Sequence, residues 1–212
     1  MLLTERQKDA FKELINIAFT LTASSLSELV DTPVLLEVPD VSVHPMSGLS
    51  KEFSNLVQGQ FVSVQQGFKG KVTGDALLLL DYNSAVTLTN LLMENRGIKM
   101  SRLDTSSCEV LLEVGNILLN ACMGMFGNLL QIRISFAVPR FHLQKLYSIL
   151  NSLILGTKGM RYALVVRTAF RFSDGSLIGY IVIVLGVTSL QGLIRSIDTW
   201  VQMTTPTVKA KA

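Results

Sequence analysis

The chain has few of the residues that most often build disulfides, metal sites and nucleophilic triads. Among its 212 residues are two cysteines and two histidines. Cys108 and Cys122 lie on one predicted helix, where their spacing corresponds to about 21 Å, too far apart for a disulfide. We therefore expect both thiols to be reduced. Neither His44 nor His142 has a set of partners at ligand spacing, which argues against a metal site and against a Ser-His-Asp arrangement.

Charge and long apolar runs are also scarce. Charged residues make up 17% of the chain, the net charge is only +3, and basic and aromatic residues interleave only briefly, so we expect no nucleic-acid surface. No run reaches the roughly 18 to 20 uninterrupted apolar residues of a membrane span, and the first residues lack the pattern of a signal peptide. These absences predict a cytoplasmic protein without a membrane span.

What the chain does contain is a large apolar fraction. Apolar residues make up 49% of the sequence, and the mean hydropathy is +0.42. A chain of this length and composition can bury a sizeable core. We also expect it to hide a further surface against a partner or within an oligomer.

A polar pattern of long spacing occurs twice. The first copy is D-x3-E-x2-N-x22-P, and the second is E-x3-E-x2-N-x22-P. Every position of the second copy lies 100 residues after its counterpart, and the two sets are Asp9, Glu13, Asn16 and Pro39, and Glu109, Glu113, Asn116 and Pro139. A gapped pattern repeated in full predicts that the chain consists of two related halves.

Hydrophobic periodicity predicts the same order of elements in both halves: helix, strand, short helix, two strands, helix. In the first half these are 4–29, 34–43, 51–57, 60–69, 71–81 and 83–94. In the second half they are 105–130, 132–138, 142–154, 161–172, 176–185 and 188–201. We interpret residues 1–203 as a single domain made of two repeats, about 4–96 and 101–202, followed by a flexible tail at 204–212.

Each copy places a glutamate and an asparagine on one helix face. Glu13 and Asn16 are three residues apart, as are Glu113 and Asn116, and residues at this spacing are neighbours on a helix surface. The plainer interpretation is a solvated face with hydrogen bonds between helices. Preservation of the spacing in both copies favours a functional interpretation, in which the carboxylate binds a partner's lysine and the carboxamide orients one water. Because asparagine is a poor general base, that water must attack a group that is already reactive.

The pattern [D/S]-x3-E-x2-N-x22-P resembles that of the CheC/CheX/FliY phosphatases of bacterial and archaeal chemotaxis. The two-copy arrangement over essentially the whole chain is similar to CheC in particular. In the second copy Glu109 departs from the aspartate or serine that is usual at this position. The resemblance implies an α/β (α+β) fold, with helices packed on an antiparallel sheet and two halves related by a pseudo-two-fold axis.

The resemblance also implies an activity: hydrolysis of the phospho-aspartate on a CheY-like receiver domain in chemotaxis or another two-component pathway. Asn16 and Asn116 would orient the attacking water, and Glu13 and Glu113 would pair with a lysine of the receiver. Mg²⁺ would belong to the receiver, and the chain would need no cofactor of its own. An acyl phosphate is labile, so positioning a water in line is a sufficient contribution.

The remaining motif residues would support these four. Asp9 and Glu109 would cap or support their helices, and Pro39 and Pro139 would turn the chain beside them. Members of the CheC group also bind CheD, a receptor glutamine deamidase, which is therefore a further candidate partner.

Two other interpretations remain open. The chain could be a non-catalytic adaptor that binds a receiver domain, CheD or a flagellar switch component through the same faces. It could also form a homodimer through an exposed sheet edge, which is compatible with either function.

Overall fold

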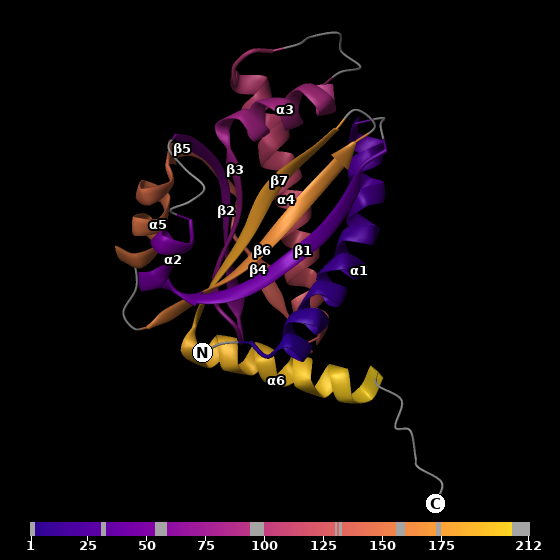
Figure 1. Ribbon diagram of the computed structural model, residues 1–212, viewed down its shortest axis with the longest axis vertical. Coiled ribbons are helices and arrows are strands. Elements are labelled where there is room, and N and C mark those ends of the chain that lie inside the picture. The colour runs from indigo at the N-terminus through magenta and orange to yellow at the C-terminus, as the bar shows by residue number, and fades with distance from the viewer. Residues whose placement is uncertain are drawn as a thin grey trace, which may run out of the picture.

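The computed structural model describes residues 3–30, 33–53, 59–93, 100–129, 131, 133–155, 160–172 and 175–204. Within them the chain forms six helices and one seven-stranded antiparallel sheet (Figure 1). The first half contains α1 (Glu5–Val30), β1 (Leu35–Pro45), α2 (Met46–Glu52), β2 (Gln60–Gly70), β3 (Gly74–Asp81) and α3 (Tyr82–Met93). The second half contains α4 (Thr105–Leu129), β4 (Ile134–Phe136), β5 (Arg140–Lys145), α5 (Leu146–Leu155), β6 (Arg161–Phe172), β7 (Gly175–Gly186) and α6 (Val187–Thr204). The predicted fold class, an α/β chain with helices on an antiparallel sheet, is confirmed.

The sheet interleaves strands from the two halves. The strand order is β1-β6-β7-β3-β2-β4, and β5 also pairs with β2. Only the hairpins β2–β3 and β6–β7 join strands of the same half. Every other described pairing joins a first-half strand to a second-half strand. The element order predicted for the first half is present, and the second half departs from it by having two strands, β4 and β5, where one was predicted. The interpretation of the halves as repeats stays a prediction.

Helices cover both faces of the sheet. On one face lie the long helices α1 and α4 with α3 and α6, and on the other lie the short helices α2 and α5 (Figure 1). The run from Leu77 to Leu80 in β3 shows why both layers are needed. Leu78 and Leu80 pack into the larger core under α1 and α4, whereas Leu77 and Leu79 pack into the smaller core under α2 and α5. Successive side chains of a strand point to opposite faces, so a continuous apolar run is buried on both sides.

The two motif prolines lie where the sheet ladder is interrupted. In β1 the register to β6 shifts between Glu37 and Asp40, which places Pro39 in the irregularity. In the second half the corresponding stretch is broken outright into β4 and β5, and Pro139 lies in the gap between them. Proline has no N–H to donate to a ladder, so it is tolerated at a bulge or between strands.

Several predicted boundaries were wrong. The helix predicted for 142–154 begins only at Leu146, because residues up to Lys145 form β5, which pairs with β2. The strand predicted for 132–138 is reduced to Ile134–Phe136. The short helix predicted for 51–57 begins earlier and is Met46–Glu52. Of the tail expected at 204–212, Thr204 is the last residue of α6, and 205–212 lie outside the described residues.

One helix in the described part of the chain, Thr105–Leu129, is long and apolar enough to span a membrane by length and composition alone. Half of its most apolar 18-residue window is buried inside the protein. The helix packs against α1 and against β2 and β3, which is how the core helix of a globular protein behaves. The absence of a membrane span stays a prediction.

Candidate functional site

The first copy of the motif lies along the outer side of α1. The helix begins with a capping box, in which the Gln7 backbone N–H donates to Thr4 Oγ1 at 3.3 Å and the Thr4 N–H donates to Gln7 Oε1 at 3.0 Å. Farther along, Asp9 and Glu13 are exposed and Asn16 is half-buried. The glutamate therefore faces solvent, and the asparagine lies where the helix meets the sheet edge.

The carboxamide of Asn16 is held by the backbone of β1. The Val38 N–H donates to Asn16 Oδ1 at 3.1 Å. Val38 lies within the register irregularity of β1, next to exposed Pro39, and its own side chain is buried at 6% exposure. Because a backbone N–H can only donate, this bond fixes which end of the carboxamide is the oxygen.

The second copy lies on α4 with the same exposures but different contacts. Glu109 and Glu113 are exposed, and Asn116 is half-buried. Asn116 Oδ1 accepts from two side-chain amides: Asn120 Nδ2 at 2.9 Å and Gln66 Nε2 at 3.4 Å. Gln66 Nε2 also donates to the Ala137 carbonyl at 3.1 Å, and that acceptor fixes the orientation of the glutamine amide.

The different contacts follow from the break between β4 and β5. The counterpart of Val38 is Val138, whose side chain is 81% exposed. Among the described residues, the donors to Asn116 Oδ1 are side chains, and the backbone N–H of Val138 is not one of them. The neighbouring Ala137 N–H instead donates to the Gly67 carbonyl at 2.8 Å. The continuous, bulged strand β1 thus supplies a backbone donor to Asn16. Where the corresponding strand is interrupted, side chains supply the donors to Asn116.

In both copies the amide nitrogen of the asparagine is open. Within the described part of the chain, neither Asn16 Nδ2 nor Asn116 Nδ2 has a hydrogen-bond partner, and neither is among the buried unpartnered atoms. Each carboxamide is therefore anchored through its oxygen and presents its NH2 group to solvent, next to an exposed glutamate. The arrangement suits the binding of a polar group supplied by another molecule.

The two copies lie apart on the molecule. Asn16 contacts β1, the strand at one end of the strand order, and Asn116 contacts Gln66 of β2, beside β4 and β5 at the other end. The structure therefore brings Glu13 together with Asn16, and Glu113 together with Asn116, as two candidate sites. It does not combine the copies into one site.

Sequence reasoning missed apolar and polar neighbours of the motif. Ile17 and Leu21 on α1 are 46% and 74% exposed, beside Asn16, and Phe136 of β4 is 38% exposed near the second copy. Gln66 was also missed, although a signal existed. Val62 and Val64 of β2 point into the larger core, and Gln66 continues this alternation. A polar side chain at such a buried position needs a hydrogen-bond partner.

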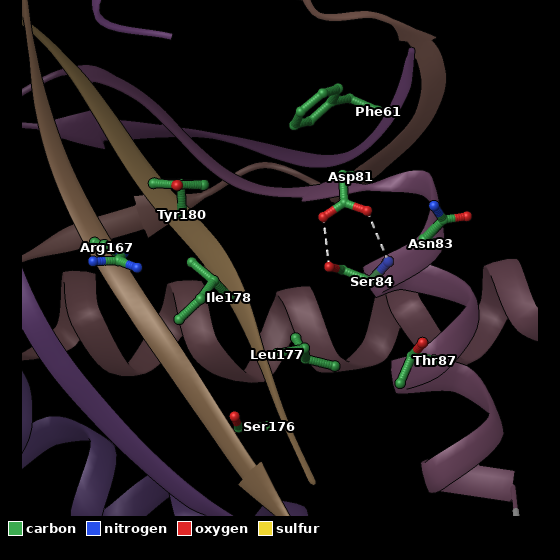
Figure 2. Close-up of a pocket in the computed structure, with 10 residues that line it drawn as sticks. All are labelled: Phe61, Asp81, Asn83, Ser84, Thr87, Arg167, Ser176, Leu177, Ile178 and Tyr180. Carbon is green, nitrogen blue, oxygen red and sulfur yellow. Dashed lines mark hydrogen bonds between the residues drawn. The ribbon is translucent and has the colours of Figure 1, made fainter. Parts of the chain in front are cut away.

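Within the described residues, no group of three or more His, Cys, Asp or Glu side chains is placed to hold a metal ion. A pocket of about 510 Å³ lies elsewhere, between α3 and strands β3, β6 and β7 (Figure 2). Arg167 and Tyr180 lie on its strand side, and Asp81 and Ser84 lie where α3 begins. Asp81 accepts from the Ser84 backbone N–H at 2.9 Å and from the Ser84 hydroxyl, so Asp81 caps α3. No motif residue lines this pocket.

Comparisons with known proteins give relatives from the flagellar motor. No protein-family model matches the chain. It is 28% identical over 122 residues to the flagellar motor switch phosphatase FliY of Bacillus subtilis, and the match covers 58% of this chain and 30% of that protein. The chain thus spans less than a third of the length of that relative.

Solved structures share the fold. Thermotoga maritima FliY has a TM-score of 0.72 at 19% identity, with 94% of this chain and 99% of that chain covered. FliM in a Helicobacter pylori FliG-FliM complex has a TM-score of 0.64 at 10% identity, with 91% of this chain and 100% of that chain covered. At these identities the likeness shows the fold and not the activity.

Proposed function

From the fold of the CheC/CheX/FliY phosphatases, which this chain shares, we propose that the protein hydrolyses the phospho-aspartate of a CheY-like receiver domain. The observation that carries the proposal is a half-buried carboxamide held in place by hydrogen bonding to its oxygen, beside an exposed glutamate. This arrangement occurs once on α1 and once on α4.

The proposed roles follow from what each side chain can do. Asn16 keeps one free lone pair on Oδ1 after accepting from Val38, and that lone pair can accept an O–H of a water. The water then turns a lone pair of its own away from the asparagine, toward phosphorus. Its oxygen bonds to phosphorus as the bond to the aspartyl oxygen breaks, so the aspartate leaves as a carboxylate and the water proton passes to the phosphate.

The glutamates would dock the partner. Glu13 and Glu113 are exposed and can pair with a lysine of the receiver, placing the asparagine over the acyl phosphate. The exposed apolar side chains of Ile17 and Leu21 would add contact area at the first site. Mg²⁺ would be supplied by the receiver, where it neutralises charge on the phosphoryl group. The proposed location is the cytoplasm, where receiver domains signal.

The decisive experiment measures loss of phosphate from a phosphorylated CheY-type receiver in the presence of Mg²⁺. The protein should accelerate the loss, and the variant with both Asn16→Ala and Asn116→Ala should return the rate to that of the receiver alone. Asn128→Ala is a matched control, because Asn128 is an exposed asparagine on the same helix as Asn116. Circular dichroism verifies the fold of each variant.

Replacing Glu13 and Glu113 by glutamine tests whether the glutamates bind the receiver without taking part in the chemical step. This pair of changes should raise KM about two- to fivefold, as expected for loss of exposed ion pairs, with little change in kcat. A double asparagine variant as fast as the parent would contradict the water-orienting role.

A non-catalytic adaptor is the second candidate. It is favoured by the fold shared with FliM, which is solved in a complex with FliG. A protein that binds a receiver domain, CheD or a flagellar switch component without accelerating phosphate loss would support the adaptor. A homodimer through a sheet edge is a separate proposal, and sedimentation of the purified protein would test it.

A further inference from the structure

The two candidate sites differ in how many donors their asparagine oxygen receives. Among the described residues, Asn16 Oδ1 accepts one hydrogen bond, from the Val38 N–H. Asn116 Oδ1 accepts two, from Asn120 and Gln66. A carboxamide oxygen has two lone pairs, so Asn16 retains one and Asn116 retains none.

The extra donor at the second site comes from one position on the helix. Asn120 lies four residues after Asn116, a spacing that places two side chains on the same helix face. Its counterpart in the first copy is Thr20, whose hydroxyl donates to the Asn16 backbone carbonyl at 2.9 Å and leaves the carboxamide alone. The difference in donors therefore traces to Thr20 in one copy and Asn120 in the other.

We propose that Asn120 attenuates the second site by occupying the lone pair of Asn116 that would hold the attacking water. The inference rests on the proposed function and deepens it, because it ranks the two sites. The first site binds the water through a hydrogen bond to Asn16 Oδ1 and carries most of the activity. The second can contact a water only through Nδ2, which binds a lone pair of the water and leaves its O–H groups undirected.

The remaining contacts would keep Asn116 oriented without Asn120. Gln66 is buried at 3% exposure and is held by the Ala137 carbonyl. Its bond to Asn116 supplies one donor to Oδ1, as the Val38 N–H does at the first site. One donor fixes the carboxamide, and a second only removes acceptor capacity.

The contact is also unfavourable for the fold in one respect. Asn120 Oδ1 is buried and has no hydrogen-bond partner within the part of the chain that the structure describes, and a buried polar atom left unpaired is destabilising. Threonine and asparagine have similar helix propensities. Asn120→Thr removes the unpaired oxygen and supplies the hydroxyl that Thr20 carries in the first copy, so its midpoint of thermal unfolding should not fall.

A reciprocal exchange tests the inference in proteins with one site each. In the Asn16→Ala background only the second site remains, and adding Asn120→Thr should raise kcat about tenfold, the effect of one hydrogen bond to the reacting water. In the Asn116→Ala background only the first site remains, and adding Thr20→Asn should lower kcat by a similar factor. KM should stay constant in both, because Glu13 and Glu113 are unchanged.

The signs of the two effects decide the outcome. If both exchanges lower kcat, Asn120 supports the site, and if neither changes kcat, the contact has no role; either result overturns the inference. A parent protein that does not accelerate phosphate loss would instead contradict the proposed function.

The hydrogen bond between Asn120 and Asn116 can be tested by NMR without a receiver. The ¹³Cγ resonance of Asn116 should shift in Asn120→Thr and stay unchanged in Asn128→Ala. An unmoved resonance would overturn the contact.

Discussion

At the scale of single residues, two side chains of the same type and spacing differ in what they can still bind. Asn16 is anchored by a backbone N–H, and Asn116 by the amides of two other side chains. The backbone donor is retained with any residue except proline at position 38, whereas a side-chain donor is lost with one substitution. The second site is therefore the one that single mutations can retune most easily.

The two thiols provide a prediction at the same scale. Cys122 is fully buried, and the loss of solvation raises the pKa of its thiol to about 12. Cys108 is half-buried, and its pKa is raised mainly by desolvation and further by Asp104 and Glu109. Because the thiolate is the reactive form, a thiol reagent at pH 8 should label Cys108 slowly and leave Cys122 unlabelled in the folded protein.

Raising the pH should speed the labelling of Cys108, since more thiolate forms as the pH approaches a raised pKa. Denaturant should release the second equivalent. Mass spectrometry of the labelled protein counts the equivalents, and Cys108→Ser identifies the first. Labelling of Cys122 in the folded state at a rate equal to that of Cys108 would contradict the burial of α4 against the sheet.

At the scale of elements, one glycine sets the distance between α4 and the sheet. A Cβ added at Gly115 would lie 2.6 Å from the Val64 side chain of β2, which is closer than any packing allows. Gly115 is next to Asn116 in α4, so the close approach of helix and strand also brings Asn116 within reach of Gln66 on β2.

Gly115→Ala should therefore lower the free energy of unfolding by about 1 to 3 kcal/mol, the usual effect of overpacking. Gly124→Ala on the same helix is the matched control, because a Cβ there meets no atom within 4 Å. That change should raise the free energy of unfolding by about 0.5 to 1 kcal/mol, since alanine suits a helix interior better than glycine. Urea denaturation measures both, and an equal response of the two variants would contradict the packing of α4 on β2.

Sequence patterns predicted the long elements well and the short ones poorly, for physical reasons. The starts of α1 and α4 were predicted closely, and in the structure Thr4 and Asp104 each accept a hydrogen bond from a backbone N–H of the first turn, as helix caps do. In β5, Phe141 and Leu143 alternate with polar residues as a strand should, but the apolar stretch after them extended the helix prediction backwards. Strand pairing with β2 decided the outcome, and a pairing between residues so far apart leaves no local trace in the sequence.

The candidate site was predictable only in part. The repeated spacing indicated Glu13, Asn16 and their counterparts. Gln66 belongs to another element and the other half of the chain, so only the fold reveals its contact with Asn116.

At the scale of the whole molecule, neither half has a complete sheet. Four strand pairings cross between the halves, while only the two hairpins lie within one half. The apolar faces of α1 and α4 also pack together, with the rings of Phe11 and Phe126 edge to face at 6.1 Å. Each half alone would leave large parts of its core exposed.

We therefore expect residues 1–98 and 99–212, produced as separate chains, to be unfolded alone and to regain the fold when mixed. The intact protein should unfold in one transition, with the same midpoint by fluorescence and by circular dichroism. Heteronuclear NMR of each fragment, alone and with its complement, measures the outcome. A fragment with a dispersed spectrum on its own would show that one half is an independent unit.

The interleaved sheet also bears on how the protein is made. Leu35 of β1 pairs with Arg171 of β6, so β1 has no paired strand until translation has passed β6. Pairing across such sequence separation slows folding. Until β6 is available, the unpaired edge of β1 can associate with other chains and aggregate. Nascent chains of this protein should therefore depend on chaperones until β6 emerges.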